Sequence, residues 1–154
     1  MGASSWNYIE AWADSVEGTF TALRAREFAR VFSGFPAEDR PADLAELWSG
    51  DDLDETTWAG FMRTQGTHTI VDIQDLVPSE SGLDAPPARS TMRHVPVAEV
   101  VTVFGHRRPG RAEFERLPED SPLFQDDGRA TGRCLTLYDA GAPTAVAFWG
   151  CSGD

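Results

Sequence analysis

The sequence predicts a single compact α+β domain, residues 1–154, in which a small and mostly antiparallel sheet packs with about four or five helices. Apolar residues recur with near-helical spacing between residues 16 and 32. Residues 130–150 alternate between apolar and polar side chains around a turn, which indicates a β-hairpin. The composition, 41% hydrophobic and 25% charged, is that of a folded chain large enough to bury one core.

The first elements are expected to be a short strand and a long helix. Residues 4–9 are predicted to form the strand, although a helix from Asn7 through Trp12 remains an alternative. Asp14 and Glu17 match a capping box for a helix over 16–32, which Gly34 then ends. This helix is the longest element that the periodicity supports.

Two shorter helices and a strand are expected next. Pro41 at a first-turn position and Gly50 as a terminator predict the second helix. A third helix is expected from Asp54 to Gly66. The segment 67–73 is rich in β-branched residues and too short for a helix, so we predict a central strand there.

The segment 74–93 contains three prolines together with Ser, Gly and Asp, and it is expected to be an exposed loop. Valines at helical spacing predict a helix over 96–104, which Gly105 ends. A further helical turn is expected over 109–117, before a loop that leads to the C-terminal hairpin.

The hairpin is expected to turn over residues 140–143, which places Cys134 opposite Trp149. Any loop with an even number of residues also brings four apolar side chains together on one core face: Leu135, Leu137, Val146 and Phe148. Trp149 and Tyr138 then share the other face. That face is either covered by a helix or open as a shallow binding surface.

The two cysteines are expected to be reduced. Cys151 lies on a diagonal from Cys134 in this hairpin, and that geometry suits a disulfide poorly. Reduced thiols are typical of a cytosolic protein. Because the sequence also has neither a basic leader nor a long apolar run, we expect a cytoplasmic location and no membrane segment.

Acidity is the strongest functional feature of the chain. It has 25 carboxylates, 13 arginines, no lysine and a net charge of −12, which disfavours nucleic acids and anionic membranes and favours a basic protein partner. Residues 36–60 hold eight acids and the single cation Arg40. The expected partner-binding residues are this acidic stretch and its two tryptophans: Glu46, Trp48, Asp51, Asp52, Asp54, Glu55 and Trp58.

Some of the acids are expected to have a structural role rather than a partner-binding role. Acids near helix starts, such as Asp43 and Asp54, are expected to cap backbone amides. Arginines are expected to be tied up in internal ion pairs, which would leave the outer carboxylates without partners.

No catalytic, nucleotide-binding or calcium motif occurs, so we expect a binding protein rather than an enzyme, without a cofactor. His68, His94 and His106 lack the spacing of a metal site, and no metal is expected. If the chain were an enzyme, His68 would be the candidate catalytic residue.

Three segments resemble a group of short, uncharacterised acidic proteins from GC-rich bacteria: Met1 to Tyr8, Gly66 to Ile70 and Phe148 to Asp154. The resemblance implies no activity. It suggests that the two termini and the segment around His68 converge in space. Together with the hairpin, this gives an alternative aromatic pocket: Trp6, Tyr8, His68, Tyr138 and Trp149.

The sequence therefore leads to two hypotheses. In the first, an acidic binding protein sequesters or inhibits a basic protein, as immunity proteins and inhibitors do. In the second, a small enzyme or ligand-binding protein uses the aromatic pocket around His68.

Overall fold

The computed structural model describes residues 4–49, 66–77, 90–125 and 128–152, without the side chains of residues 48 and 49. The strands are β1 (Ser5–Ala11), β2 (Asp75–Val77), β3 (Thr91–His94), β4 (Thr131–Asp139) and β5 (Ala142–Cys151). The helices are α1 (Val16–Phe32), α2 (Leu44–Ser49), α4 (Val97–Phe104) and α5 (Arg111–Glu115). Single 3-10 turns are η1 (Ala37–Asp39), η2 (Ile70–Asp72) and η3 (Pro122–Phe124).

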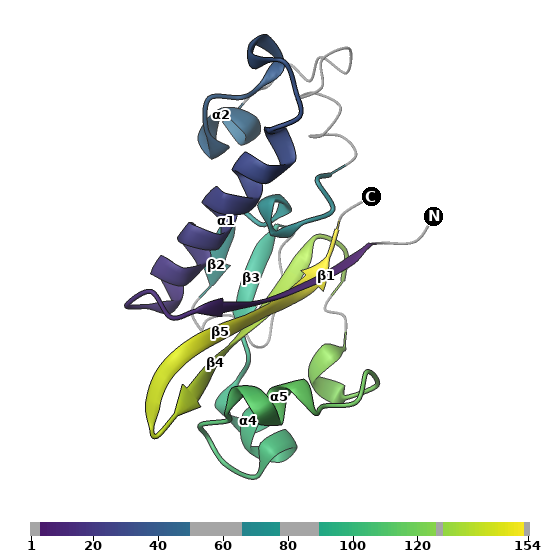
Figure 1. Cartoon of the computed structure of the whole chain (residues 1–154). Helices are drawn as coiled ribbons and strands as arrows, with labels where there is room; N and C mark the ends of the chain where they lie inside the picture. Colours follow the sequence, from purple (N-terminus) through teal and green to yellow (C-terminus); the bar gives the residue numbers. More distant parts are fainter. Residues whose placement is uncertain (1–3, 50–65, 78–89, 126–127, 153–154) are drawn as a thin grey trace.

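The five strands form one mixed sheet in the order β1-β5-β4-β3-β2. β1, β5 and β4 are antiparallel neighbours, whereas β3 and β2 run parallel to β4. The α+β class and the single domain are confirmed, and both the N-terminal strand and the C-terminal hairpin lie where the sequence predicts them (Figure 1).

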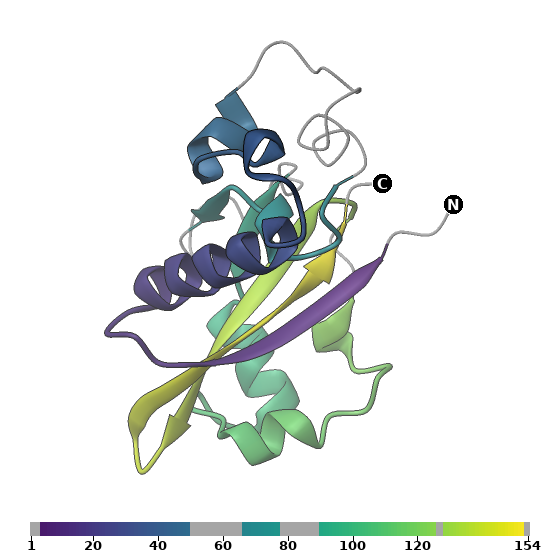
Figure 2. The same cartoon turned by 45° about the horizontal axis from the view of Figure 1, so that its top comes forward.

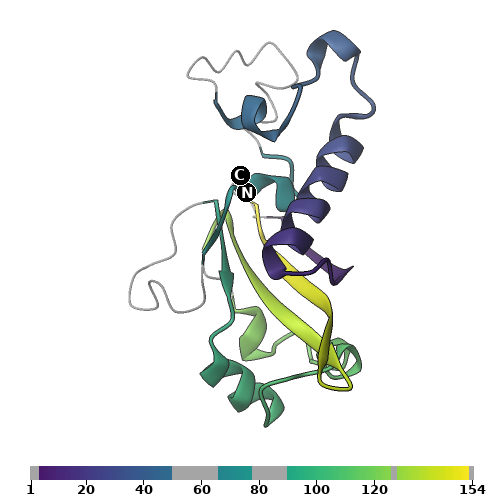
Figure 3. The ribbon, with the colours of Figure 1, turned by 90° about the vertical axis from the view of Figure 1, so that its left-hand side faces the viewer.

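The sheet separates two layers of helices (Figure 3). α1 packs on one face, where Phe20 and Leu23 meet Phe148 and Val146 in a core of fully buried side chains. α4, α5 and η3 cover the other face, where Trp149 lies in a second core. Because both faces are covered, strands β4 and β5 are buried along most of their length, and Trp149 is only 7% exposed.

The predicted long helix is confirmed, but its cap is Ser15 rather than Asp14. Ser15 Oγ accepts a hydrogen bond from Gly18 N at 2.9 Å, which satisfies one of the free amides at the helix start. Asp14 instead has φ 64° and makes the turn between β1 and α1. α2, α4 and α5 confirm the helices predicted around 41–49, 96–104 and 109–117. The helix predicted from Asp54 lies outside the described residues.

The strand predicted over 67–73 is wrong, because this segment forms a tight turn that contains η2. The Asp72 carboxylate accepts hydrogen bonds from Thr67 N at 2.6 Å and from His68 N at 3.1 Å, and His68 has φ 56°. A left-handed residue cannot continue an extended ladder. The strands appear instead inside the predicted 74–93 loop, as β2 and the start of β3, while residues 78–89 lie outside the described part.

The predicted hairpin register is also wrong. The turn consists of Ala140 and Gly141, with φ 47° and 79°, and it is two residues long rather than four. A bulge between Leu137 and Tyr138 then shifts the pairing by one residue, so Cys134 pairs with Phe148 rather than with Trp149. This shift places Leu135 and Leu137 on the face of Trp149, and Val146 and Phe148 on the opposite face.

On the α1 face, the Trp6 indole lies across two glycines of neighbouring strands. A Cβ built on Gly150 would lie 2.7 Å from Trp6 Cζ2 and 2.3 Å from the Thr131 carbonyl oxygen. A Cβ on Gly132 would lie 2.8 Å from Trp6 Cη2. The two glycines therefore allow the indole to pack flat against the sheet where β1, β5 and β4 meet.

We expect Gly150→Ala to destabilise the protein by about 3 kcal/mol, because the Thr131 carbonyl belongs to the backbone and cannot move aside. The measurement is urea unfolding followed by tryptophan fluorescence. Gly34→Ala is the matched control, since a Cβ at Gly34 has no atom within 4 Å; its effect should stay within about 0.5 kcal/mol. Equal stabilities of the two variants would contradict this packing.

Candidate functional site

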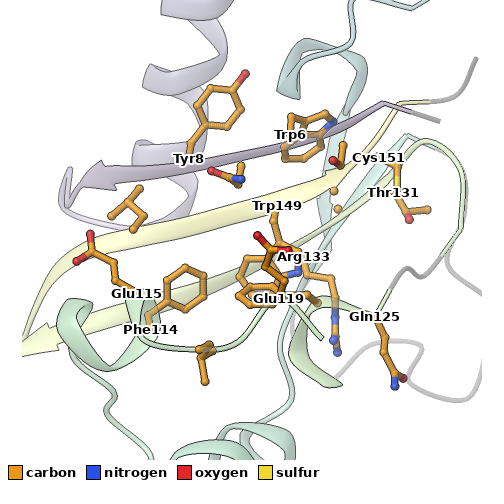
Figure 4. A pocket seen from close by; sticks show the side chains of 17 residues that line it. Trp6, Tyr8, Phe114, Glu115, Glu119, Gln125, Thr131, Arg133, Trp149 and Cys151 are labelled. Atoms are coloured by element: carbon orange, nitrogen blue, oxygen red, sulfur yellow. The ribbon is translucent and has the colours of Figure 1, made fainter. Parts of the chain in front are cut away.

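A cavity of about 660 Å³ lies beside β1, on the face of the sheet opposite α1 (Figure 4). We call it the edge cavity. Its floor consists of side chains that pair across three strands: Asn7 of β1 pairs with Trp149 of β5, which pairs with Arg133 of β4. Ser5, Cys151 and Thr131 form the next row in the same way.

Aromatic side chains make the wall of the edge cavity. The Phe114 ring of α5 and the Phe124 ring of η3 lie 5.5 Å and 5.7 Å from the Trp149 ring, and 5.6 Å from each other. The Phe114–Phe124 and Phe124–Trp149 contacts are edge-on, which is a favourable arrangement for aromatic pairs. Leu117 and Ile9 extend this apolar surface toward β1.

Charged groups of both signs also line the edge cavity. Arg133 has a side chain only 8% exposed; it donates to Glu99 Oε2 at 2.6 Å and to the Leu123 carbonyl at 3.1 Å. Glu115 and Glu119 are exposed. Glu115 forms an ion pair with Arg111 at 2.8 Å, whereas among the described residues no ion pair involves Glu119. The buried cation is therefore neutralised, and the exposed rim is acidic.

Two indole groups are buried on opposite faces of the sheet, that of Trp149 beside the edge cavity and that of Trp6 in the core under α1. Among the described residues, neither Trp6 Nε1 nor Trp149 Nε1 has a hydrogen-bond partner. A buried donor without an acceptor is unfavourable, by about 1–3 kcal/mol.

A separate polar cluster joins β1 to α1 on the opposite face. The Tyr8 hydroxyl donates to Glu27 Oε2 at 3.2 Å, and Arg30 donates to the same oxygen at 2.8 Å and 3.0 Å. Burial, followed by the neighbouring Glu27 carboxylate, raises the pKa of Tyr8 to about 12. The hydroxyl therefore stays protonated at neutral pH, and the cluster fixes the position of α1 on the sheet.

The structure does not bring the five residues of the predicted aromatic pocket together. The Trp6 and Tyr8 side chains lie on the α1 side of the sheet, and Trp149 lies on the other (Figure 4). The exposed side chain of His68 does not line the edge cavity, nor does Tyr138, which lies beside the hairpin turn with the Arg108 guanidinium 5.7 Å from its ring. The termini do converge, because Ser152 N donates to the Ser4 carbonyl at 2.9 Å.

Most of the predicted partner-binding residues lie outside the described part of the chain: Asp51, Asp52, Asp54, Glu55 and Trp58. Trp48 belongs to α2, but its side chain is not described. Glu46 is exposed; its amide donates to Asp43 Oδ1 at 2.8 Å, and its carboxylate accepts from Ala42 N. These contacts confirm that Asp43 has a capping role.

No sequence pattern predicts the residues that form the edge cavity, above all Phe114, Phe124 and Arg133. Phe114 falls in the helical turn predicted over 109–117, but nothing in the sequence indicates that this turn covers Trp149. The pairing of Arg133 with Trp149 depends on the hairpin bulge, which has no signal in the sequence that we can identify.

The described lining of the edge cavity combines aromatic rings and carboxylates with the Arg133 guanidinium and the Cys151 thiol, so it offers both apolar and polar contacts to a bound molecule. No family model, curated protein or solved structure matches the chain. Among the described residues, no helix is long and apolar enough to cross a membrane, and no three potential ligands from His, Cys, Asp and Glu are grouped as a metal site.

We expect iodoacetamide to modify one thiol in the folded protein, at Cys151. Cys151 is partly exposed and lines the edge cavity, whereas Cys134 is buried and neither forms a disulfide. Burial also raises the pKa of the Cys134 thiol, so the reactive thiolate does not form there near neutral pH. Mass spectrometry should find one adduct on the native chain and two in urea.

The matched control is Cys151→Ser, which should show no adduct until it is unfolded. Equal labelling rates of the two thiols in the native protein, or an adduct on folded Cys151→Ser, would contradict the described burial.

Proposed function

We propose that this protein acts by binding a basic protein partner, as an inhibitor or immunity-type protein would. The observation that carries the proposal is that, among the described residues, positively charged side chains mostly have partners within the molecule, whereas many negatively charged ones do not. Most of the described arginines contact carboxylates, backbone carbonyls or aromatic rings within the molecule, whereas many of the described carboxylates remain at the surface without an ion pair. A surface of this kind attracts basic proteins and speeds their association.

Six described arginines illustrate the first half of this imbalance. Arg26 forms a bidentate pair with Glu10, while Arg30, Arg111 and Arg133 pair with other carboxylates. Arg40 donates to two backbone carbonyls, and the Arg24 guanidinium lies 5.1 Å from the Phe20 ring.

The second half is the set of exposed acids. Among the described residues no ion pair is formed by several exposed carboxylates: Glu17, Glu38, Glu119, Asp120 and Asp139. The sequence contains four further acids within residues 51–55. The excess of carboxylates over arginines gives the whole chain a net charge of −12.

A second candidate function, the binding of a small ligand, is favoured by the volume of the edge cavity and its aromatic wall. The two candidates differ in their dependence on charge. Capture of a basic protein weakens with added salt, whereas binding of an uncharged ligand between aromatic rings does not.

The test is affinity capture of the tagged full chain from lysate of its own source, at low and at high salt, with mass spectrometry of the bound proteins. We expect a stoichiometric basic protein that is retained at low salt and released at high salt. The triple variant Asp51→Arg, Asp52→Arg and Asp54→Arg should capture at least tenfold less of this partner, because three reversals change the charge of residues 51–54 by six units.

The matched control reverses three exposed acids elsewhere, Glu17, Asp120 and Asp139, to arginine. It has the same net charge as the first triple variant and should retain most of the captured partner. Capture of no basic protein at either salt concentration, or equal losses in the two variants, would reject a localised acidic binding site.

A further inference from the structure

The open side of β1 and the edge cavity beside it form one continuous surface. β1 is the border of the sheet, with β5 on one side only (Figure 2). We propose that this surface binds an extended basic segment of a partner protein, which adds to the sheet along β1 and inserts an apolar side chain into the edge cavity. The basic character of the occupant rests on the proposed function; the mode of binding goes beyond it.

The backbone of β1 is arranged for strand addition. Ser152 N donates to Ser4 O at 2.9 Å, and Trp12 N donates to Thr144 O at 3.0 Å. In an antiparallel ladder, backbone groups face the neighbour at every second residue, so the even-numbered residues of β1 bond to β5. The amides and carbonyls of Ser5, Asn7 and Ile9 therefore point away from the sheet.

In the described part of the chain, this border lacks several features that normally protect an edge strand. β1 is seven residues long, contains no proline or lysine, and pairs with β5 without a bulge. Its one charged side chain, Glu10, is held on the α1 face by Arg26. The opposite border shows the contrast, since β2 has three residues and Pro78 follows it in the sequence.

The edge cavity lies on the side of β1 to which Asn7 and Ile9 belong. Side chains of an added strand alternate between the two faces, so every second one would point toward this cavity. An apolar side chain there would contact the rings of Phe114 and Trp149, which both line the edge cavity.

The charges around β1 and the edge cavity favour a basic segment over a second copy of this chain as the occupant. Glu115 and Glu119 lie on the rim, while the one guanidinium of the lining, that of Arg133, is already bound by Glu99. A second copy would bring another −12 of charge to the same border. Repulsion between two such molecules disfavours β1–β1 pairing. Arginines two residues before and after the inserted apolar side chain lie on the same face of the added strand and would meet the rim carboxylates.

The probe is a pool of seven-residue peptides with Val, Ile, Phe, Tyr or Trp at the central position, arginine two residues before and two residues after it, and threonine elsewhere; the control pool has glutamate in place of arginine. NMR spectra of the labelled full chain should show shifts at the amides of Ser5, Asn7 and Ile9 and at the Trp149 indole with the arginine pool alone. Methylation of the peptide nitrogens that face β1 should weaken binding about tenfold.

Asn7→Pro is the decisive variant, because it removes an outward amide while it leaves every β1–β5 hydrogen bond in place. It should weaken binding of the arginine peptides about tenfold, whereas Asn7→Thr, which keeps the amide, should not. Glu119→Arg should also weaken binding. Its matched control is Glu38→Arg, which makes the same change of charge away from the cavity and should have little effect.

The proposal would be overturned if no peptide of the arginine pool binds, or if the glutamate pool binds equally well. It would also be overturned if neither Asn7→Pro in the protein nor methylation of the peptide weakens binding, or if the free protein forms a dimer that Asn7→Pro dissociates. The proposed function is tested separately, since the Asp51, Asp52 and Asp54 reversals should leave peptide binding at β1 intact. If a basic partner is captured equally well by the Asn7→Pro variant, strand addition at β1 is rejected, whereas the proposed function is not.

Discussion

The register of the β4–β5 hairpin determines which side chains enter each of the two layers. Its two-residue turn and the bulge after Leu137 set the parity of every pair further along the sheet. Phe148 therefore meets α1, and Trp149 meets α5 and η3. A shift by one residue would exchange these two rings between the layers and would remove Gly150 from its place under Trp6.

This register also creates the candidate site. Trp149 and Arg133 become neighbours on one face, and β1 is positioned beside them as the open border of the sheet. The edge cavity arises because Phe114 and Phe124 cover Trp149 but leave the strip next to β1 unfilled. The position of β1 thus links the shape of the sheet to the location of the edge cavity.

Charge is the second feature on which the proposed function rests. Arginine has a planar group that binds carboxylates at two points, and the bidentate Arg26–Glu10 pair and the nearly buried Arg133 use this property inside the fold. The remaining carboxylates act at a distance through the field of the whole molecule. A basic partner would therefore be attracted by the surface as a whole and then held by local contacts, among which we propose strand addition at β1.

Local patterns in the sequence determined the α+β class, the long helix over 16–32, the shorter helices and the existence of a C-terminal hairpin, because helix periodicity and strand alternation act over short distances. Tertiary structure alone decided the turn at 67–73, where the Asp72 carboxylate outweighs the β-propensity of its neighbours, and the hairpin bulge. It also decided the site. The side chains that meet in the edge cavity belong to segments more than a hundred residues apart in sequence, and only packing brings them together.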